Sequence, residues 1–168
     1  MKINVLLVIV VIFTVYKVID GYKKGMVKEI ISLISLLVLS AVVALLANGI
    51  GSYQRGEMFR VIIAVVLLAL LGIVHHLLGV VFFSAKLVAK LPIISFLDKL
   101  LGIVFGAAEV VLFMWTLYFL IWKLELGAVE QVILSYTQES RILEWLYSHN
   151  YLRSTIEDLL ARYVGGAV

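Results

Sequence analysis

The sequence predicts an all-α membrane protein with four transmembrane helices, followed by an amphipathic helical tail. Hydrophobic residues make up 64% of the 168 residues, whereas a soluble domain is usually about 45–50% apolar. The excess is concentrated in four long runs, and a spanning helix needs about 20 mostly apolar residues. Since backbone groups in hydrocarbon must bond internally, we expect each of these runs to be a helix.

The four runs occupy residues 3–19, 30–47, 59–83 and 100–122. Together they define a predicted transmembrane domain over residues 1–122. Lys17 stands near the end of the first run, where a lysine side chain can extend to the membrane interface. A cleaved signal peptide is the alternative for this run, but no small-x-small cleavage site follows it. The first turn is predicted at Asp20-Gly21, and Gly25 is a candidate second break.

The connection between the third and fourth runs, residues 84–99, is predicted to contain a short interfacial segment. Lys86 and Lys90 are four residues apart and therefore share one helix face, with apolar residues elsewhere. This pattern is typical of an amphipathic helix that lies on the membrane surface. Pro92 is expected to interrupt that helix.

Positive charge is distributed unevenly among the connections. The first and third carry seven lysines when the end of the first run is included, whereas the N-terminus and the second connection carry Lys2, Arg55 and Arg60. Basic residues favour the cytoplasmic side of a membrane. Segments 20–29 and 84–99 are therefore predicted to be cytoplasmic, with both termini outside. Attraction to anionic lipid headgroups is a second use for the lysines of the first connection.

Beyond the fourth run, residues 123–168 are more polar and are predicted to form an amphipathic helical tail. Ser154 and Glu157 have the spacing of a capping box, which predicts a helix that begins at Ser154 and stops near Gly165. Thr137 is predicted to cap an earlier helix. Two uses for the tail remain open. It packs on its own bundle or at the lipid interface, or it forms a docking surface for another protein.

Glu109 lies near the middle of the fourth run, where a charged side chain is costly and usually faces the protein interior. His75 and His76 lie in the third run. By the helical rise, all three lie about 10–13 Å deep from the same side. We expect Glu109 to meet one histidine, since adjacent helical residues point in different directions. Three roles for Glu109 remain open: a neutral structural group, part of a proton relay or gate, or a contact with another subunit.

Two motifs in the sequence resemble the bacterial colicin V production protein family. The first precedes the second span and has the order basic-Gly-x-x-basic-acid: Lys24, Gly25, Lys28 and Glu29. The second opens the fourth span with the spacing Gly-x-x-x-Gly: Gly102 and Gly106. The resemblance covers most of the chain. It implies a multi-pass protein of the bacterial inner membrane that is linked to colicin V production or export, with no known substrate or cofactor.

Gly102 and Gly106 predict a close approach by another helix, because small residues let helix backbones come near each other in membranes. Packing within the chain and dimerisation are both consistent with this pattern.

No pattern predicts catalysis, a cofactor site or a metal site. The chain has no cysteine and a net charge of only +3, and it has no basic stripe suited to nucleic acid. Adjacent histidines at positions 75 and 76 lack the spacing of a helical zinc pair. We therefore expect the protein to have no enzymatic activity. One hypothesis is an accessory or scaffold component for toxin production, export or envelope maintenance, which acts with a membrane or secretion partner. The alternative is a small oligomeric channel or transporter that uses Glu109 and His75 or His76.

Overall fold

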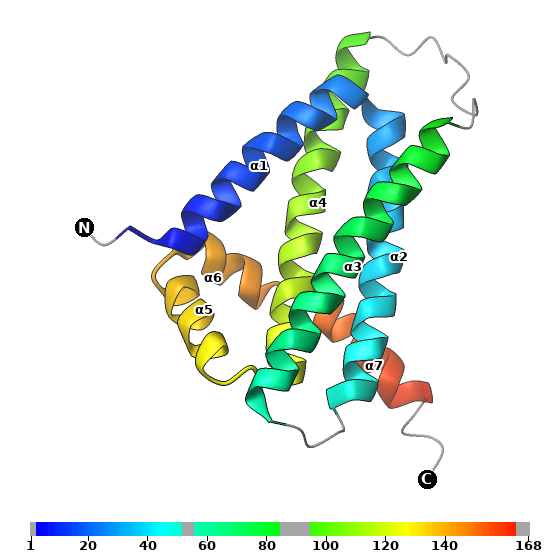
Figure 1. Ribbon diagram of the computed structural model, residues 1–168. Helices are drawn as coiled ribbons and strands as arrows, with labels where there is room; N and C mark the ends of the chain where they lie inside the picture. The colour runs from blue at the N-terminus through cyan, green and yellow to red at the C-terminus, as the bar shows by residue number, and fades with distance from the viewer. Residues whose placement is uncertain (1–2, 52–55, 85–94, 164–168) are drawn as a thin grey trace.

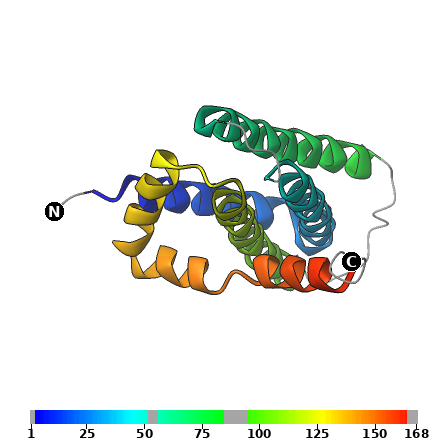
Figure 2. The ribbon, with the colours of Figure 1, turned by 90° about the horizontal axis from the view of Figure 1, so that it is seen from below.

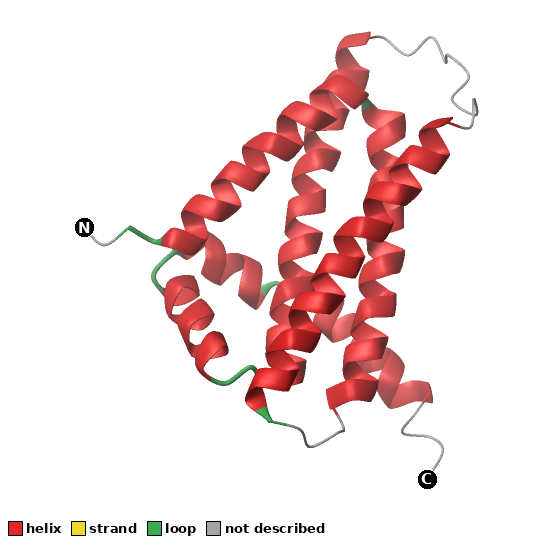
Figure 3. Cartoon of the chain, in the orientation of Figure 1, coloured by secondary structure: helices red, strands yellow, loops and turns green. Residues whose placement is uncertain are grey.

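The computed structural model describes residues 3–51, 56–84 and 95–163, and these residues are helical almost throughout (Figure 3). The helices are α1 (Val5–Lys24), α2 (Met26–Gly51), α3 (Glu57–Ser84), α4 (Ser95–Leu124), α5 (Ala128–Gln138), α6 (Arg141–Ser148) and α7 (Tyr151–Tyr163). The described part of the chain contains no strand, so the predicted all-α class is confirmed. The interfacial segment predicted around Lys86 and Lys90 lies outside the described residues.

Helices α1 to α4 are each long and apolar enough to cross a membrane, which confirms the four predicted spans. All four extend beyond the apolar runs from which they were predicted, and α3 does so least. Helix α1 continues to Lys24, α2 begins at Met26, and α4 begins at Ser95. The reason is that polar residues continue the hydrogen bonding of a helix where it leaves the hydrocarbon, so composition marks the span and not the end of the helix.

The turn between the first two spans lies at Gly25 and not at Asp20-Gly21. Asp20 and Gly21 are inside α1, because the Asp20 carboxylate pairs with Lys24 one turn further along the same helix. Gly25 has a φ of 80°, in the region that favours glycine. Asp98 of α4 accepts a hydrogen bond from the backbone N–H of Met26 at 2.9 Å and so caps the start of α2.

Helix α4 is the centre of the bundle. It packs along both α1 and α2, whereas α3 lies chiefly against α2 and touches α4 less extensively (Figures 1 and 2). The most deeply buried part of the core is at its C-terminal end, where Tyr118, Phe119, Leu120 and Ile121 are at most 1% exposed. The predicted proximity of the third and fourth spans is therefore correct, but α2 is the main neighbour of α3.

The tail folds back onto its own bundle. Helix α5 packs on α1, and α6 and α7 pack on α4. Trp115 of α4 donates its indole N–H to the carbonyl of Leu146 at 3.0 Å and accepts a hydrogen bond from the Asn150 amide at 2.9 Å. The structure therefore shows the first of the two uses left open for the tail, packing on its own bundle. Part of the tail surface stays exposed and apolar.

Both predicted caps of the tail helices are wrong. Helix α7 begins three residues before Ser154, because the Asn150 side chain accepts the N–H of Arg153 and caps the helix there. The Ser154 hydroxyl instead bonds to the carbonyl of Tyr151. Ser140 is the N-cap of α6, and Thr137 is buried in α5, where its hydroxyl contacts that of Tyr118 at 3.0 Å. Gly165 lies outside the described residues.

Candidate functional site: a polar cavity between the helices

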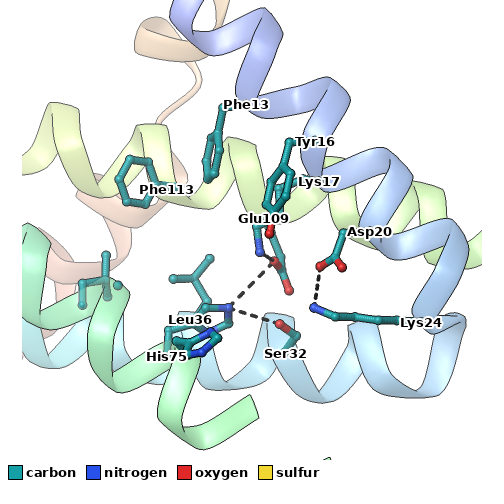
Figure 4. Close-up of a pocket in the computed structure, with 13 residues that line it drawn as sticks. Phe13, Tyr16, Lys17, Asp20, Lys24, Ser32, Leu36, His75, Glu109 and Phe113 are labelled. Atoms are coloured by element: carbon teal, nitrogen blue, oxygen red, sulfur yellow. Dashed lines mark hydrogen bonds and ion pairs between the residues drawn. The ribbon is translucent and has the colours of Figure 1, made fainter. Parts of the chain in front are cut away.

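A cavity of about 330 Å³ lies beside α4, with walls from all four long helices. Its lining is apolar toward one end and polar toward the other (Figure 4). The apolar lining residues include Phe13, Leu36, Leu71 and Phe113. The polar lining residues include Lys17, Asp20, Lys24, Ser32, His75, His76 and Glu109. So many polar side chains are unusual inside a bundle of spanning helices, where such side chains are commonly functional.

Glu109 forms an ion pair with Lys17, with 2.5 Å between Oε2 and Nζ. The Glu109 side chain is 0% exposed and that of Lys17 is 13% exposed. Lys17 therefore turns into the bundle, and the expectation that it extends to the interface is wrong. A buried carboxylate without a cation is very unfavourable, so the pairing with Glu109 outweighs hydration of the lysine. Lys17 and Ser32 are the members of this site that were not predicted from the sequence.

His75 also lies beside Glu109. Its Nε2 atom is 3.9 Å from Glu109 Oε2 and 3.2 Å from the hydroxyl of Ser32. His76 lines the same cavity but is exposed. The structure thus brings Glu109 and His75 together, with Ser32 of α2 as a third member. A relay role for this group stays a prediction.

Several polar atoms around this site are buried without a hydrogen-bond partner: both carboxylate oxygens of Glu29, Oε1 of Glu109 and Nδ1 of His75. Glu29 is 0% exposed, and Lys24 approaches one of its oxygens at 3.8 Å. Unsatisfied buried polar atoms cost free energy and are rare in structural cores. Their concentration here marks this region as the strongest candidate for function. Among the described residues, no three histidine or acidic side chains gather in a way that could hold a metal ion.

Gly102 and Gly106 lie against the backbone of α1. A Cβ atom added at Gly102 would overlap the carbonyl of Gly21, and one added at Gly106 would overlap the carbonyl of Lys17. These glycines therefore allow α1 and α4 to touch through their backbones, which places Lys17 next to Glu109. This glycine face is occupied within the chain, so dimerisation through it would require α1 to move away.

A model of the colicin V production protein family matches residues 4–151. The chain belongs to the colicin V production protein family. The match includes all four spanning helices and continues through α5 and α6, so the family region extends into the tail. Comparison with curated proteins gives no match, and comparison with solved structures gives none.

The family motif between the first two spans forms one side of the polar region. Gly25 provides the turn, and a Cβ atom there would overlap the carboxylate of Asp98. Lys24 pairs with Asp20 and approaches Glu29, whereas Lys28 is partly exposed. The motif therefore holds the end of α1 to the start of α4, and its acidic residue points into the protein.

A signal for Lys17 and its glycine contacts was present in the sequence. Lys17 and Gly21 are four residues apart, as are Gly102 and Gly106, and Glu109 follows three residues later. Each set shares a helix face. Two small-residue faces, each with one charge of opposite sign, are the pattern expected of two helices that touch and form an ion pair.

Proposed function

We propose that this protein is an accessory subunit of the bacterial inner membrane that supports toxin production or export, or the maintenance of the envelope that these depend on. Family membership and four helices suited to cross a membrane support the setting. The proposal includes no enzymatic step. It places the turn between α1 and α2 in the cytoplasm and both termini outside, on the strength of the lysine distribution.

The exposed face of the tail is the observation that carries this proposal. On α6 and the start of α7, large apolar side chains face outward: Ile142 is 61% exposed, Trp145 54% and Tyr151 62%. Leu143 and Leu146, on the neighbouring face of α6, are buried against the bundle. The buried leucines hold α6 against the bundle, so the exposed apolar side chains beside them form a surface in a fixed position. Aromatic residues are enriched at the centres of protein interfaces.

Crosslinking in native membranes, followed by mass spectrometry, tests this role. The variant carries Ile142→Gln together with Trp145→Gln, which changes the outward face and leaves the buried leucines in place. Glu144→Gln, on the same helix, is the matched control. A stoichiometric foreign protein that is captured by the wild type and the control, but not by the variant, is the expected result. Self-crosslinks alone, unchanged in the variant, would contradict the proposal.

A small oligomeric channel or transporter is the second candidate, and the polar cavity is the observation that favours it. Glu109, Lys17 and His75 meet inside the bundle, where charged groups commonly line pathways for ions and protons. Proton flux into vesicles that contain the purified protein is the test. Flux that disappears with His75→Ala, and persists with the exposed-face variant of α6, would replace the accessory proposal with this one.

A further inference from the structure

The cavity has the polarity profile of a phospholipid. Phe13 and Phe113 lie at one end, whereas Asp20 and Lys24 lie toward the turn between α1 and α2 (Figure 4). Eleven residues separate Phe13 from Lys24, which is about 16 Å along α1. This length is close to the hydrocarbon thickness of one leaflet, about 15 Å. A lipid in the leaflet at that end would therefore place its headgroup at the polar end and its chains at the aromatic end.

The helices that flank the cavity expose apolar side chains suited to contact with lipid. On α1, Val8, Ile12 and Val15 are 44–65% exposed, and α3 exposes Val65 and Ile73 to a similar degree. Whatever enters between these helices from the side comes from the bilayer. Acyl chains cannot hydrogen-bond to the polar lining, so chains alone would leave that lining unsatisfied. A headgroup can bond to it.

The charges of the lining select the kind of headgroup. Lys17 is neutralised by its ion pair with Glu109, whose side chain is 0% exposed. The remaining accessible pair is Lys24 and Asp20, with side chains 31% and 23% exposed. Both side chains line the cavity and stay partly exposed in the pair, so a ligand phosphate can approach the ammonium and a ligand ammonium can approach the carboxylate. The lining thus offers one cation and one anion side by side, and Glu29 approaches the cation at 3.8 Å from behind the lining.

We propose that this cavity binds a phospholipid whose headgroup joins a phosphate to a primary ammonium. The phosphate bonds to Lys24 and the ammonium to Asp20, in a charge arrangement that is complementary to the pair. The cavity volume of about 330 Å³ equals that of about eleven water molecules at about 30 Å³ each, which is enough space for the headgroup. A quaternary ammonium has no N–H to donate to Asp20, and a headgroup without an amine, such as that of phosphatidylglycerol, has no cation for it. The site is independent of any role in toxin export.

Native mass spectrometry of the purified full chain measures this preference. The protein is mixed with equal amounts of phosphatidylethanolamine, phosphatidylcholine and phosphatidylglycerol that carry the same acyl chains. Phosphatidylethanolamine is expected to be retained about tenfold over the other two, as for one charge-assisted hydrogen bond. In Asp20→Asn this preference over phosphatidylcholine is expected to disappear. Asp158→Asn, an exposed position on α7, is the matched control and should keep the preference.

Several results would overturn the proposal. Equal retention of the three lipids by the wild type would mean that the protein has only unspecific lipid neighbours. Preference for phosphatidylglycerol would mean that surface lysines attract anionic lipid. A preference that survives both Asp20→Asn and Lys24→Gln would place the lipid elsewhere, with Lys23→Gln as the control for the lysine. Full displacement by glycerophosphoethanolamine would show that the soluble headgroup alone is the ligand, because the lipid chains would then contribute nothing.

Discussion

Gly102→Ala is the substitution that most directly tests the backbone contact between α1 and α4. The added methyl group would lie well within 3.0 Å of the carbonyl oxygen of Gly21, and Cβ atoms essentially never approach another heavy atom more closely than 3.0 Å. The obstacle is backbone and not a flexible side chain, so no rotamer change relieves it. The two helices must separate, and Lys17 must then move relative to Glu109.

The expected loss of stability follows from two effects. Overpacking of a filled interface costs about 1–3 kcal/mol, and occasionally more when backbone must shift. A gap of about 0.5–1 Å at neighbouring contacts also forfeits a quarter to a half of their dispersion energy. We therefore expect Gly102→Ala to lower the free energy of unfolding by about 3 kcal/mol. The loss outweighs the gain of about 1 kcal/mol that alanine brings over glycine in a helix.

Unfolding of the purified protein in mixed detergent micelles, followed by circular dichroism, is the assay. Gly72→Ala is the matched control, because a Cβ atom at Gly72 in α3 would meet nothing within 4 Å. We expect Gly72→Ala to keep or slightly raise the unfolding free energy. Equal stability of Gly102→Ala, Gly72→Ala and the wild type would refute the close contact of the two backbones.

Three further predictions concern stability and use the same assay. Glu109→Gln leaves Lys17 buried without its partner and should lose about 3–5 kcal/mol, whereas Lys17→Gln with Glu109→Gln should lose less than the single variant; a double loss equal to the sum would mean that the pair does not interact. Asn150→Ala removes the cap of α7 and should lower the free energy of unfolding by about 1 kcal/mol, whereas Ser154→Ala should lower it by less than half of that. The reverse order would mean that Ser154 is the cap. Asp98→Ala should lose about 1 kcal/mol because it uncaps α2, and an unchanged value would show that the N–H of Met26 finds another partner.

The spans were predictable from the sequence because the constraint behind them is strong. A helix in hydrocarbon needs a long apolar run, and the chain has four. The proximity of Glu109 and His75 was also accessible, because depth in a spanning helix follows from counting residues. The Ser32 partner of His75 was not. Ser32 lies inside the second apolar run, and nothing in the sequence indicated that it would face His75.

Lys17 shows why the remaining features were harder to predict. By position alone it resembles a lysine that extends to the interface. Its inward direction depends on how α1 crosses α4, which in turn depends on Gly102 and Gly106, 85 and 89 residues further along the chain. The predicted start of α7 was wrong for a local reason. Asn150 and Ser154 are both good caps, and tertiary contact with Trp115 selects Asn150. Short-range patterns cannot make that choice.

Toxin release from cells is the measurement that tests the accessory role most directly. A strain that lacks the chain is complemented with the wild type, with Ile142→Gln plus Trp145→Gln, or with Lys17→Gln plus Glu109→Gln. Immunoblots confirm equal membrane levels of the three proteins. We expect the exposed-face variant of α6 to lose toxin release, whereas the variant without the buried ion pair retains it. Loss with the ion-pair variant, and normal release with the exposed-face variant, would contradict the accessory role and favour a transport pathway.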